Sequence, residues 1–202
     1  MNIAVPVAVV VVAFFVGAIP FGVLVSRAFY GTDIRRSGSG NIGAANALRT
    51  LGKRGAFAVL ALDALKGLAP VLAAKALGGT TLGVLAALAA VVGHCWSPFL
   101  GFKGGKGVAT LLGAAIALWW PSGLAFGLVW IAAVIVCGYA SVGSMLAALA
   151  LAPVLWFGVG RIGFVYGLVS ALIIIYRHRE NLERLRRGTE NRLSLLKAPR
   201  QS

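Results

Sequence analysis

Residues 35–49 combine glycines, small polar residues and arginines in a pattern suited to binding an anion. Alternating glycines let backbone N–H groups converge into a nest, and Arg49 offers a fork of donors that fits phosphate. Four more side chains could add neutral hydrogen bonds: Ser37, Ser39, Asn41 and Asn46. A flexible Gly/Ser linker is the alternative, but a linker has no need of two asparagines and a downstream arginine at helical spacing.

A second glycine-rich basic segment, Phe102 to Thr110, leads directly into an apolar segment. Free N–H groups and the positive end of a helix dipole would meet Lys103 and Lys106 there, which predicts a phosphate site. The segment is not a P-loop of nucleotide hydrolases, because the glycine spacing differs and Gly107 stands where Ser or Thr should hold magnesium. A short positively charged loop at a membrane surface would explain the lysines but not the interleaved glycines.

The third basic segment begins at Tyr176 and continues through Glu190. Leu182 and Leu185 with basic neighbours suit an interfacial helix on an anionic leaflet. His178 and Asn181 are three residues apart on one helical face, and they are better candidates for a site.

Several other polar residues leave two interpretations open. Ser141 and its neighbour Ser144 could donate to a ligand or cap a helix. Asp63 and Lys66 within an apolar segment either neutralise one another or form a functional site. His94 is a packing residue or a wall of the site. The two cysteines have no metal-ligand spacing and behave as small hydrophobes, so we expect no metal and no cofactor.

The elements that carry these segments are membrane helices. Of the 202 residues, 59% are hydrophobic and only 12% charged, which a soluble core cannot accommodate. A span needs about 20 mainly apolar residues. We predict an all-α integral membrane protein, a single domain of residues 1–202, with about seven spans near 3–25, 55–76, 82–97, 106–120, 123–138, 142–158 and 161–177.

Charge distribution predicts how these spans are oriented. With seven spans, 16 of the 19 Lys and Arg residues fall on one side of the membrane. The positive-inside rule then places the N-terminus outside and the basic tail 178–202 in the cytoplasm, where the tail contributes to the site. The basic residues cluster outside the apolar segments rather than on a solvated face, so we expect the lipid bilayer as a partner and no nucleic acid.

The sequence resembles the bacterial acyl-phosphate:glycerol-3-phosphate acyltransferase family over nearly its whole length. Three parts carry the resemblance: 38–49, Gly93-His94 with 102–110, and His178-Arg179-Glu180-Asn181 with Gly188-Thr189-Glu190. Two departures concern local shape: Ala45 stands where many members have Thr, and Cys95-Trp96-Ser97-Pro98 replaces an apolar-Phe-Pro pattern.

The resemblance implies a multi-pass enzyme of the cell (inner) membrane with its active site facing the cytoplasm. It implies transfer of a fatty acyl chain from acyl phosphate to the 1-hydroxyl of glycerol 3-phosphate, the first acylation of phospholipid synthesis. We assign catalytic roles to Arg49, Lys103, His178 and Asn181. The expected substrate-binding residues are Ser37, Ser39, Asn41, Asn46, Gly104, Gly105, Lys106, Gly107, Thr110, Ser141 and Glu190.

The expected chemistry needs no covalent intermediate. The His-x4-Asp pair of acyltransferases that use thioesters is absent, since Phe99 and Glu183 follow His94 and His178 at that spacing. An acyl phosphate is already activated, so orientation and charge neutralisation can supply much of the rate. The resemblance suggests a substrate phosphate as proton acceptor, with His178 as the rival base. A transporter of a phosphorylated solute is the alternative function, although transporters usually show repeats and broken helices at the midplane.

Overall fold

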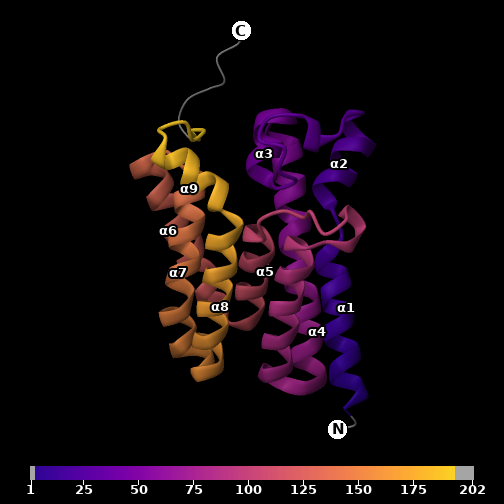
Figure 1. Ribbon diagram of the computed structural model, residues 1–202. Coiled ribbons are helices and arrows are strands. Elements are labelled where there is room, and N and C mark those ends of the chain that lie inside the picture. Colours follow the sequence, from indigo (N-terminus) through magenta and orange to yellow (C-terminus); the bar gives the residue numbers. More distant parts are fainter. Residues whose placement is uncertain (1–2, 194–202) are drawn as a thin grey trace.

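The computed structural model describes residues 3–193, and these are folded into helices joined by short loops. In chain order they are α1 (Ala4–Ala18), α2 (Phe21–Tyr30), η1 (Ile34–Arg36), α3 (Ala44–Thr50), α4 (Gly52–Cys95), η2 (Pro98–Leu100), α5 (Val108–Leu118), α6 (Trp120–Cys137), α7 (Ala140–Val159), α8 (Arg161–Arg177) and α9 (Arg179–Arg186). Figure 1 shows the long helices side by side, with the start of α1 at one end and α3 and α9 at the other.

The all-helical membrane protein that the composition predicts is confirmed. Four helical segments are long and apolar enough to cross a membrane: Ala4–Tyr30, Gly52–Leu100, Trp120–Cys137 and Ala140–Val159. The bent pair α8 and α9 makes a fifth if it is one span, and α5 is a shorter apolar helix. All seven predicted apolar segments are mainly helical, but seven crossings remain a prediction.

Two breaks divide the longest apolar stretches. The first predicted segment lies in one candidate span, Ala4–Tyr30, but its helix is interrupted at Ile19, because Pro20 lacks an N–H group and clashes with the preceding turn. Within α4 the helical geometry is lost at Gly78 and Gly79, and Gly79 has a φ of 72° that suits only glycine. These two glycines separate the predicted segments 55–76 and 82–97.

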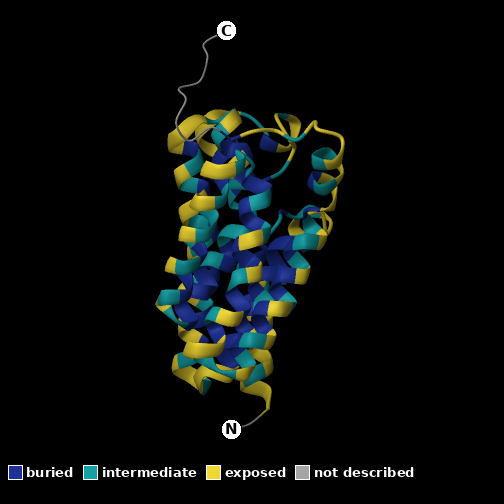
Figure 2. Ribbon diagram, turned by 90° about the vertical axis from the view of Figure 1, so that its left-hand side faces the viewer, coloured by how far each residue is buried: buried dark blue, intermediate teal, exposed yellow. Residues whose placement is uncertain are grey.

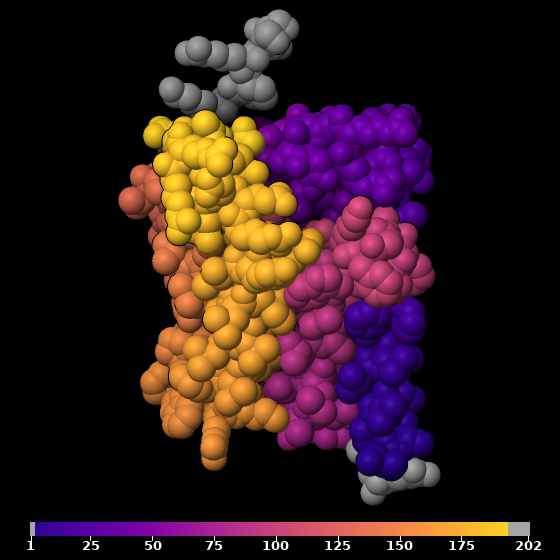
Figure 3. Space-filling view, viewed as in Figure 1, coloured from indigo at the N-terminus to yellow at the C-terminus, as the bar shows by residue number. Residues whose placement is uncertain are grey.

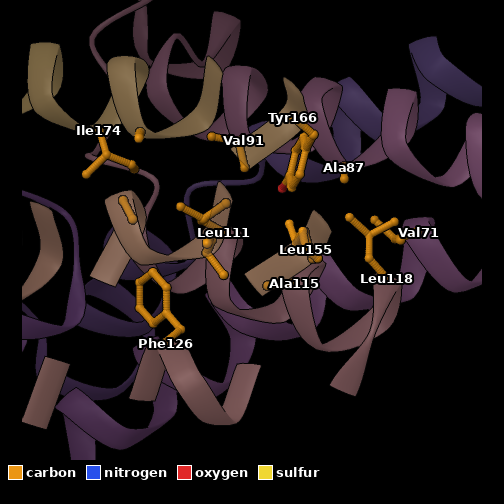
Figure 4. Close-up of a cluster of buried hydrophobic side chains, with 14 of the residues drawn as sticks. Val71, Ala87, Val91, Leu111, Ala115, Leu118, Phe126, Leu155, Tyr166 and Ile174 are labelled. Carbon is orange, nitrogen blue, oxygen red and sulfur yellow. The ribbon is translucent and has the colours of Figure 1, made fainter. Parts of the chain in front are cut away.

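The helices pack through small residues. A Cβ on Gly67 of α4 would overlap the carbonyl oxygen of Thr110 in α5, and one on Gly93 would overlap that of Phe14 in α1. Such contacts let membrane helices approach closely. Larger side chains then fill the centre of the bundle, among them Val91, Leu111, Leu155 and Tyr166 (Figure 4).

The outer surface of the bundle is apolar. Figure 2 shows buried residues gathered along the centre and exposed ones outside. The exposed positions include Phe57, Leu128, Val136, Phe157 and Leu172. A lipid environment satisfies such a surface, which water would not.

Candidate functional site

One cavity of about 360 Å³ lies where the three glycine-rich or basic segments meet. Its wall includes residues of α3 and the loop before it, the start of α5, the start of α7, the junction of α8 with α9, and the segment after α9. The space-filling view shows the segment around α9 and the segment around α3 side by side at one end of the molecule (Figure 3). Leu48 of α3 packs there against a small cluster that contains Leu193.

The loop before α3 is held by the side chain of Asn46. The amide nitrogen donates to the carbonyl oxygens of Ile34 (3.1 Å), Ser37 (3.1 Å) and Asn41 (2.9 Å). The amide oxygen accepts the backbone N–H of Ser39 at 2.9 Å. Asn46 also lines the cavity, and these bonds hold the loop around it.

The segment before α5 lies against the end of α4. A Cβ on Gly104 would overlap the carbonyl oxygen of His94, and one on Gly105 would overlap the His94 ring. Arg177, the last residue of α8, donates to the carbonyl oxygens of Gly104 (2.8 Å) and Gly105 (3.0 Å). The glycines of this segment are therefore needed for close packing, and Lys106 and Gly107 form the part that reaches the cavity wall.

The carboxylate of Glu190 accepts hydrogen bonds from three side chains around the cavity. Glu190 Oε1 accepts hydrogen bonds from Ser141 Oγ (2.9 Å) and Asn181 Nδ2 (2.5 Å), and its Oε2 accepts one from Arg184 Nε (2.7 Å). Burial alone would raise the pKa of Glu190, but these hydrogen bonds hold it below its usual value. Lys106 Nζ in turn donates to Asn181 Oδ1, so the network connects the segment before α5 with α9.

Two cations of the cavity wall are partly removed from water. Burial, helped by the charge of Arg184, lowers the pKa of Lys106 to about 8. Burial also lowers the pKa of Arg49, while the nearby carboxylate of Glu190 opposes that shift. Desolvated cations of this kind attract an anionic ligand more strongly than exposed ones do.

His178 lies at the bend between α8 and α9 and is buried. Its Nδ1 is 2.8 Å from the carbonyl oxygen of Ile174, four residues earlier. A carbonyl only accepts, so Nδ1 carries the proton and Nε2 of the neutral ring is free to accept one. The ring is thus held in the tautomer that a general base requires.

Asp63 and His94, both in α4, line the cavity. Asp63 Oδ1 is 2.7 Å from Lys66 Nζ, and His94 Nδ1 is 3.8 Å from the same oxygen. Thr110 Oγ1 lies 3.3 Å from His94 Nδ1. Lys66 also donates to the carbonyl oxygen of Ile19 at 2.7 Å, at the break between α1 and α2.

The cavity brings together most of the predicted site. The predicted residues in its wall are Ser39, Asn41, Asn46, Arg49, Lys106, Gly107, Ser141, His178, Asn181 and Glu190. The predicted residues outside the wall are Ser37, Lys103, Gly104, Gly105 and Thr110. Lys103 is exposed on the loop, and Thr110 is buried beside His94. The tail residues 194–202 of the predicted segment 178–202 lie outside the described residues.

Sequence reasoning left three contributors out of the predicted site. Arg184 lines the cavity beside Glu190, although its place in a basic run suggested only membrane attachment. Asp63 also lines the cavity, and an ionisable residue in an apolar segment was the signal for it. Arg177 supports the wall from outside, and no spacing in the sequence indicates its partners. Among residues 3–193, no group of three or more His, Cys, Asp or Glu side chains could hold a metal ion.

Comparison with known proteins points to one family. The model of the family described as glycerol-3-phosphate acyltransferase matches residues 7–188. A glycerol-3-phosphate acyltransferase of Rhodopseudomonas palustris (strain HaA2) is 40% identical over 195 residues, which cover 96% of this chain and 98% of that protein. One from Geobacter sulfurreducens is 50% identical over 184 residues, covering 90% and 94%.

Two crystal structures resemble the fold throughout. Both are of PlsY (YgiH), an integral membrane glycerol 3-phosphate acyltransferase. The glycerol 3-phosphate form matches with a TM-score of 0.91 and 38% identity, over 97% of this chain and 99% of that one. The lysophosphatidic acid form matches with a TM-score of 0.86 and 36% identity, over 95% and 96%.

Proposed function

Because the chain belongs to the glycerol-3-phosphate acyltransferase family, we propose that it transfers a fatty acyl group from acyl phosphate to the 1-hydroxyl of glycerol 3-phosphate. The products are lysophosphatidic acid and inorganic phosphate. The observation that carries the proposal is the single cavity that gathers all three basic segments. Two phosphorylated reactants must meet, and the cavity wall holds Arg49, Lys106 and Arg184 as cations for them.

We assign the donor phosphate to the start of α5. Gly107, Val108 and Ala109 line the cavity, and the first N–H groups of a helix have no partner within it. These N–H groups, the helix dipole and Lys106 together favour a bound phosphate. Four predicted residues of this region lie outside the cavity wall: Lys103, Gly104, Gly105 and Thr110. We propose that they affect the acyl phosphate only indirectly, by supporting the start of α5.

Glycerol 3-phosphate occupies the side of the cavity formed by the loop before α3 and by α9. Ser39, Asn41 and Arg49 line the first part, and His178 and Asn181 line the second. Glu190 accepts hydrogen bonds from Asn181 and Arg184 and so fixes them in place, and Ser141 donates to the same carboxylate. PlsY has a glycerol 3-phosphate form and a lysophosphatidic acid form, which supports these two compounds as ligands of this chain.

The acyl chain needs an apolar wall, and the same cavity provides one. Leu112 of α5 and Phe126, Trp130 and Ile131 of α6 line it. Ile131 is also exposed on the outer surface of the bundle, so this wall adjoins the lipid. A membrane-embedded donor could therefore enter sideways with its tail in the bilayer.

The reaction exchanges one acyl–oxygen bond for another. The 1-hydroxyl oxygen attacks the acyl carbonyl carbon, the bond from that carbon to the phosphate oxygen breaks, and the phosphate leaves with the bonding electrons. The hydroxyl proton goes to an oxygen of the departing phosphate. Lys106 and the N–H groups of α5 stabilise the charge on that leaving group. His178 Nε2 is the rival proton acceptor, and near-normal turnover of His178→Gln would remove it.

We also propose seven spans, with the cavity at the cytoplasmic face of the cell membrane. The break at Gly78 and Gly79 allows α4 to cross twice, and the short α5 completes the count. The test uses a cysteine-free background with Arg36→Cys at the cavity end or Thr80→Cys at the opposite end. An impermeant maleimide applied to intact cells should label only Thr80→Cys. Labelling of Arg36→Cys alone would reverse the orientation.

The activity test is direct. Purified protein in detergent is incubated with an acyl phosphate, with glycerol 3-phosphate, or with both. We expect phosphate release and a lysophosphatidic acid product only with both substrates. Acyl thioesters in place of acyl phosphate should give no product. A transporter of a phosphorylated solute would instead move labelled glycerol 3-phosphate into vesicles without an acyl donor.

A further inference from the structure

Asp63 is a buried acid that the proposed acyl transfer does not use. It lies in the fourth turn of α4, about 16 Å along the helix from its first residue, Gly52. Its side chain is 2% exposed, yet it forms part of the cavity wall. Buried acids inside a membrane bundle are costly and usually serve a site.

Lys66 holds this acid in place. Its Nζ lies 2.7 Å from Asp63 Oδ1 and donates to the carbonyl oxygen of Ile19, so the lysine is tied to the break between α1 and α2. The cation stabilises the carboxylate form. Asp63 is therefore a fixed hydrogen-bond acceptor rather than a mobile side chain.

Asp63 retains acceptor capacity toward the cavity. A carboxylate has about four lone-pair positions. The ion pair with Lys66 is made through Oδ1, yet among residues 3–193 this buried oxygen has no hydrogen-bond partner. A vacant acceptor in a cavity wall calls for a donor from the ligand, because a buried polar atom without a partner is unfavourable.

The charges of the cavity indicate which group of the ligand donates this hydrogen bond to Asp63. Arg49, Lys106 and Arg184 attract the phosphate, whereas the carboxylate of Asp63 repels it. A hydroxyl group is the other polar group of glycerol 3-phosphate. The 1-hydroxyl must face the acyl carbonyl at the start of α5, which leaves the 2-hydroxyl.

Resting on the proposed function, we infer that Asp63 accepts a hydrogen bond from the 2-hydroxyl of glycerol 3-phosphate and so determines specificity for the acceptor. The site then distinguishes glycerol 3-phosphate from 3-hydroxypropyl phosphate, which keeps the reacting hydroxyl and the phosphate but lacks the 2-hydroxyl. A site built to bond a hydroxyl rejects an analogue without it.

The test compares kcat/KM for these two acceptors. The native enzyme should prefer glycerol 3-phosphate by about 10- to 100-fold, the range for a hydrogen bond to a charged group. Asp63→Asn, and Asp63→Leu combined with Lys66→Met, should bring the ratio toward 1 while rates with the analogue change little. The double variant removes both charges, so no uncompensated lysine stays buried.

The ratio does not depend on how much of a variant is folded, since inactive protein lowers both rates equally. Lys75→Met is the matched control: it removes a second lysine of α4 that lies outside the cavity wall, and its ratio should equal that of the native enzyme. If the Asp63 variants turn over neither acceptor, displacement of radiolabelled glycerol 3-phosphate by the analogue gives the same ratio from binding.

The outcomes separate the two proposals. A native enzyme without phosphate release from glycerol 3-phosphate and acyl phosphate would overturn the proposed function. An active native enzyme that uses both acceptors equally, or Asp63 variants that keep the native ratio, would overturn only the role of Asp63.

Discussion

Arg177 Nη2 donates a hydrogen bond to the carbonyl oxygen of Gly104 over 2.8 Å, and so ties the last residue of α8 to the segment before α5. Its Nε bonds the next carbonyl, and its guanidinium lies 5.5 Å from the centre of the Trp96 ring. With the Gly104 and Gly105 carbonyls turned to Arg177, the segment presents Lys106 and Gly107 to the cavity.

Arg177→Ala should lower kcat/KM for acyl phosphate by about 10- to 100-fold, because two hydrogen bonds from a charged group are lost and the segment loosens. Steady-state rates at varied acyl phosphate measure this effect. Arg177→Lys should recover only part of it, since a lysine cannot reach both carbonyls with a planar fork. Arg179→Ala, two residues on and stacked on Tyr176, is the control and should keep the native rate. Native kinetics in Arg177→Ala would contradict the role of the contact.

Activity should fall in alkaline solution because Lys106 loses its charge. Its pKa is lowered to about 8, so the cation is present below that pH and lost above it. We expect kcat/KM for acyl phosphate to fall about tenfold per pH unit above pH 8, after correction for uncatalysed hydrolysis. Lys106→Arg remains charged throughout and should flatten this limb of the profile. A native profile without a decline up to pH 9.5 would exclude Lys106 as the titrating group.

Arg49→Ala should chiefly raise KM for glycerol 3-phosphate. The guanidinium lines the cavity and is the one cation of the loop–α3 segment 35–49 in its wall. Loss of charged hydrogen bonds to a phosphate predicts an increase of about 10- to 100-fold, measured at saturating acyl phosphate. Arg36→Ala removes an arginine of the same segment outside the cavity wall and should leave KM unchanged. An unaltered KM in Arg49→Ala would remove that residue from phosphate binding.

The positions of most helices could be predicted from the ends of the apolar segments in the sequence. The predicted segments and the observed helices agree within a few residues, since glycines and prolines mark their ends. The exception is the first segment, which Pro20 divides. Proline alone could not predict this break, because Pro70 and Pro153 lie inside continuous helices. Whether a proline breaks a helix depends on its neighbours in the bundle, which the sequence does not display.

The site was predictable as three segments but not as a set of contacts. Glycines beside cations identify phosphate-binding loops, and the cavity joins all three. The same glycines, however, also serve packing: Gly104 and Gly105 lie against His94. The amide of Asn46 bonds the backbone around it, a use that residue type alone cannot distinguish from ligand binding. Arg177 contacts residues more than 70 positions away, beyond any local pattern.

Glu190→Gln should weaken the packing of the segment after α9. The carboxylate accepts from Ser141, Asn181 and Arg184, and its pKa lies below the usual value. Its stabilising effect is thus present above the ordinary pKa of a glutamate and is lost as the pH falls through the lowered value. The thermal midpoint of the native protein in detergent should fall in acid more steeply than that of Glu190→Gln. Parallel acid profiles would exclude this contribution.

Lys75→Met should destabilise the protein without affecting the site. The carbonyl oxygens of Ala117 and Leu118 at the end of α5 have no partner within the helix, and Lys75 Nζ donates to them at 2.8 and 3.0 Å. Methionine keeps the apolar stem but donates nothing, so we expect a loss of about 1 to 3 kcal/mol. A lower thermal midpoint in detergent with native KM values would bear this out, whereas Lys53→Met, at an exposed position in α4, should change neither. An unchanged midpoint in Lys75→Met would mean that water or lipid satisfies these carbonyls equally well.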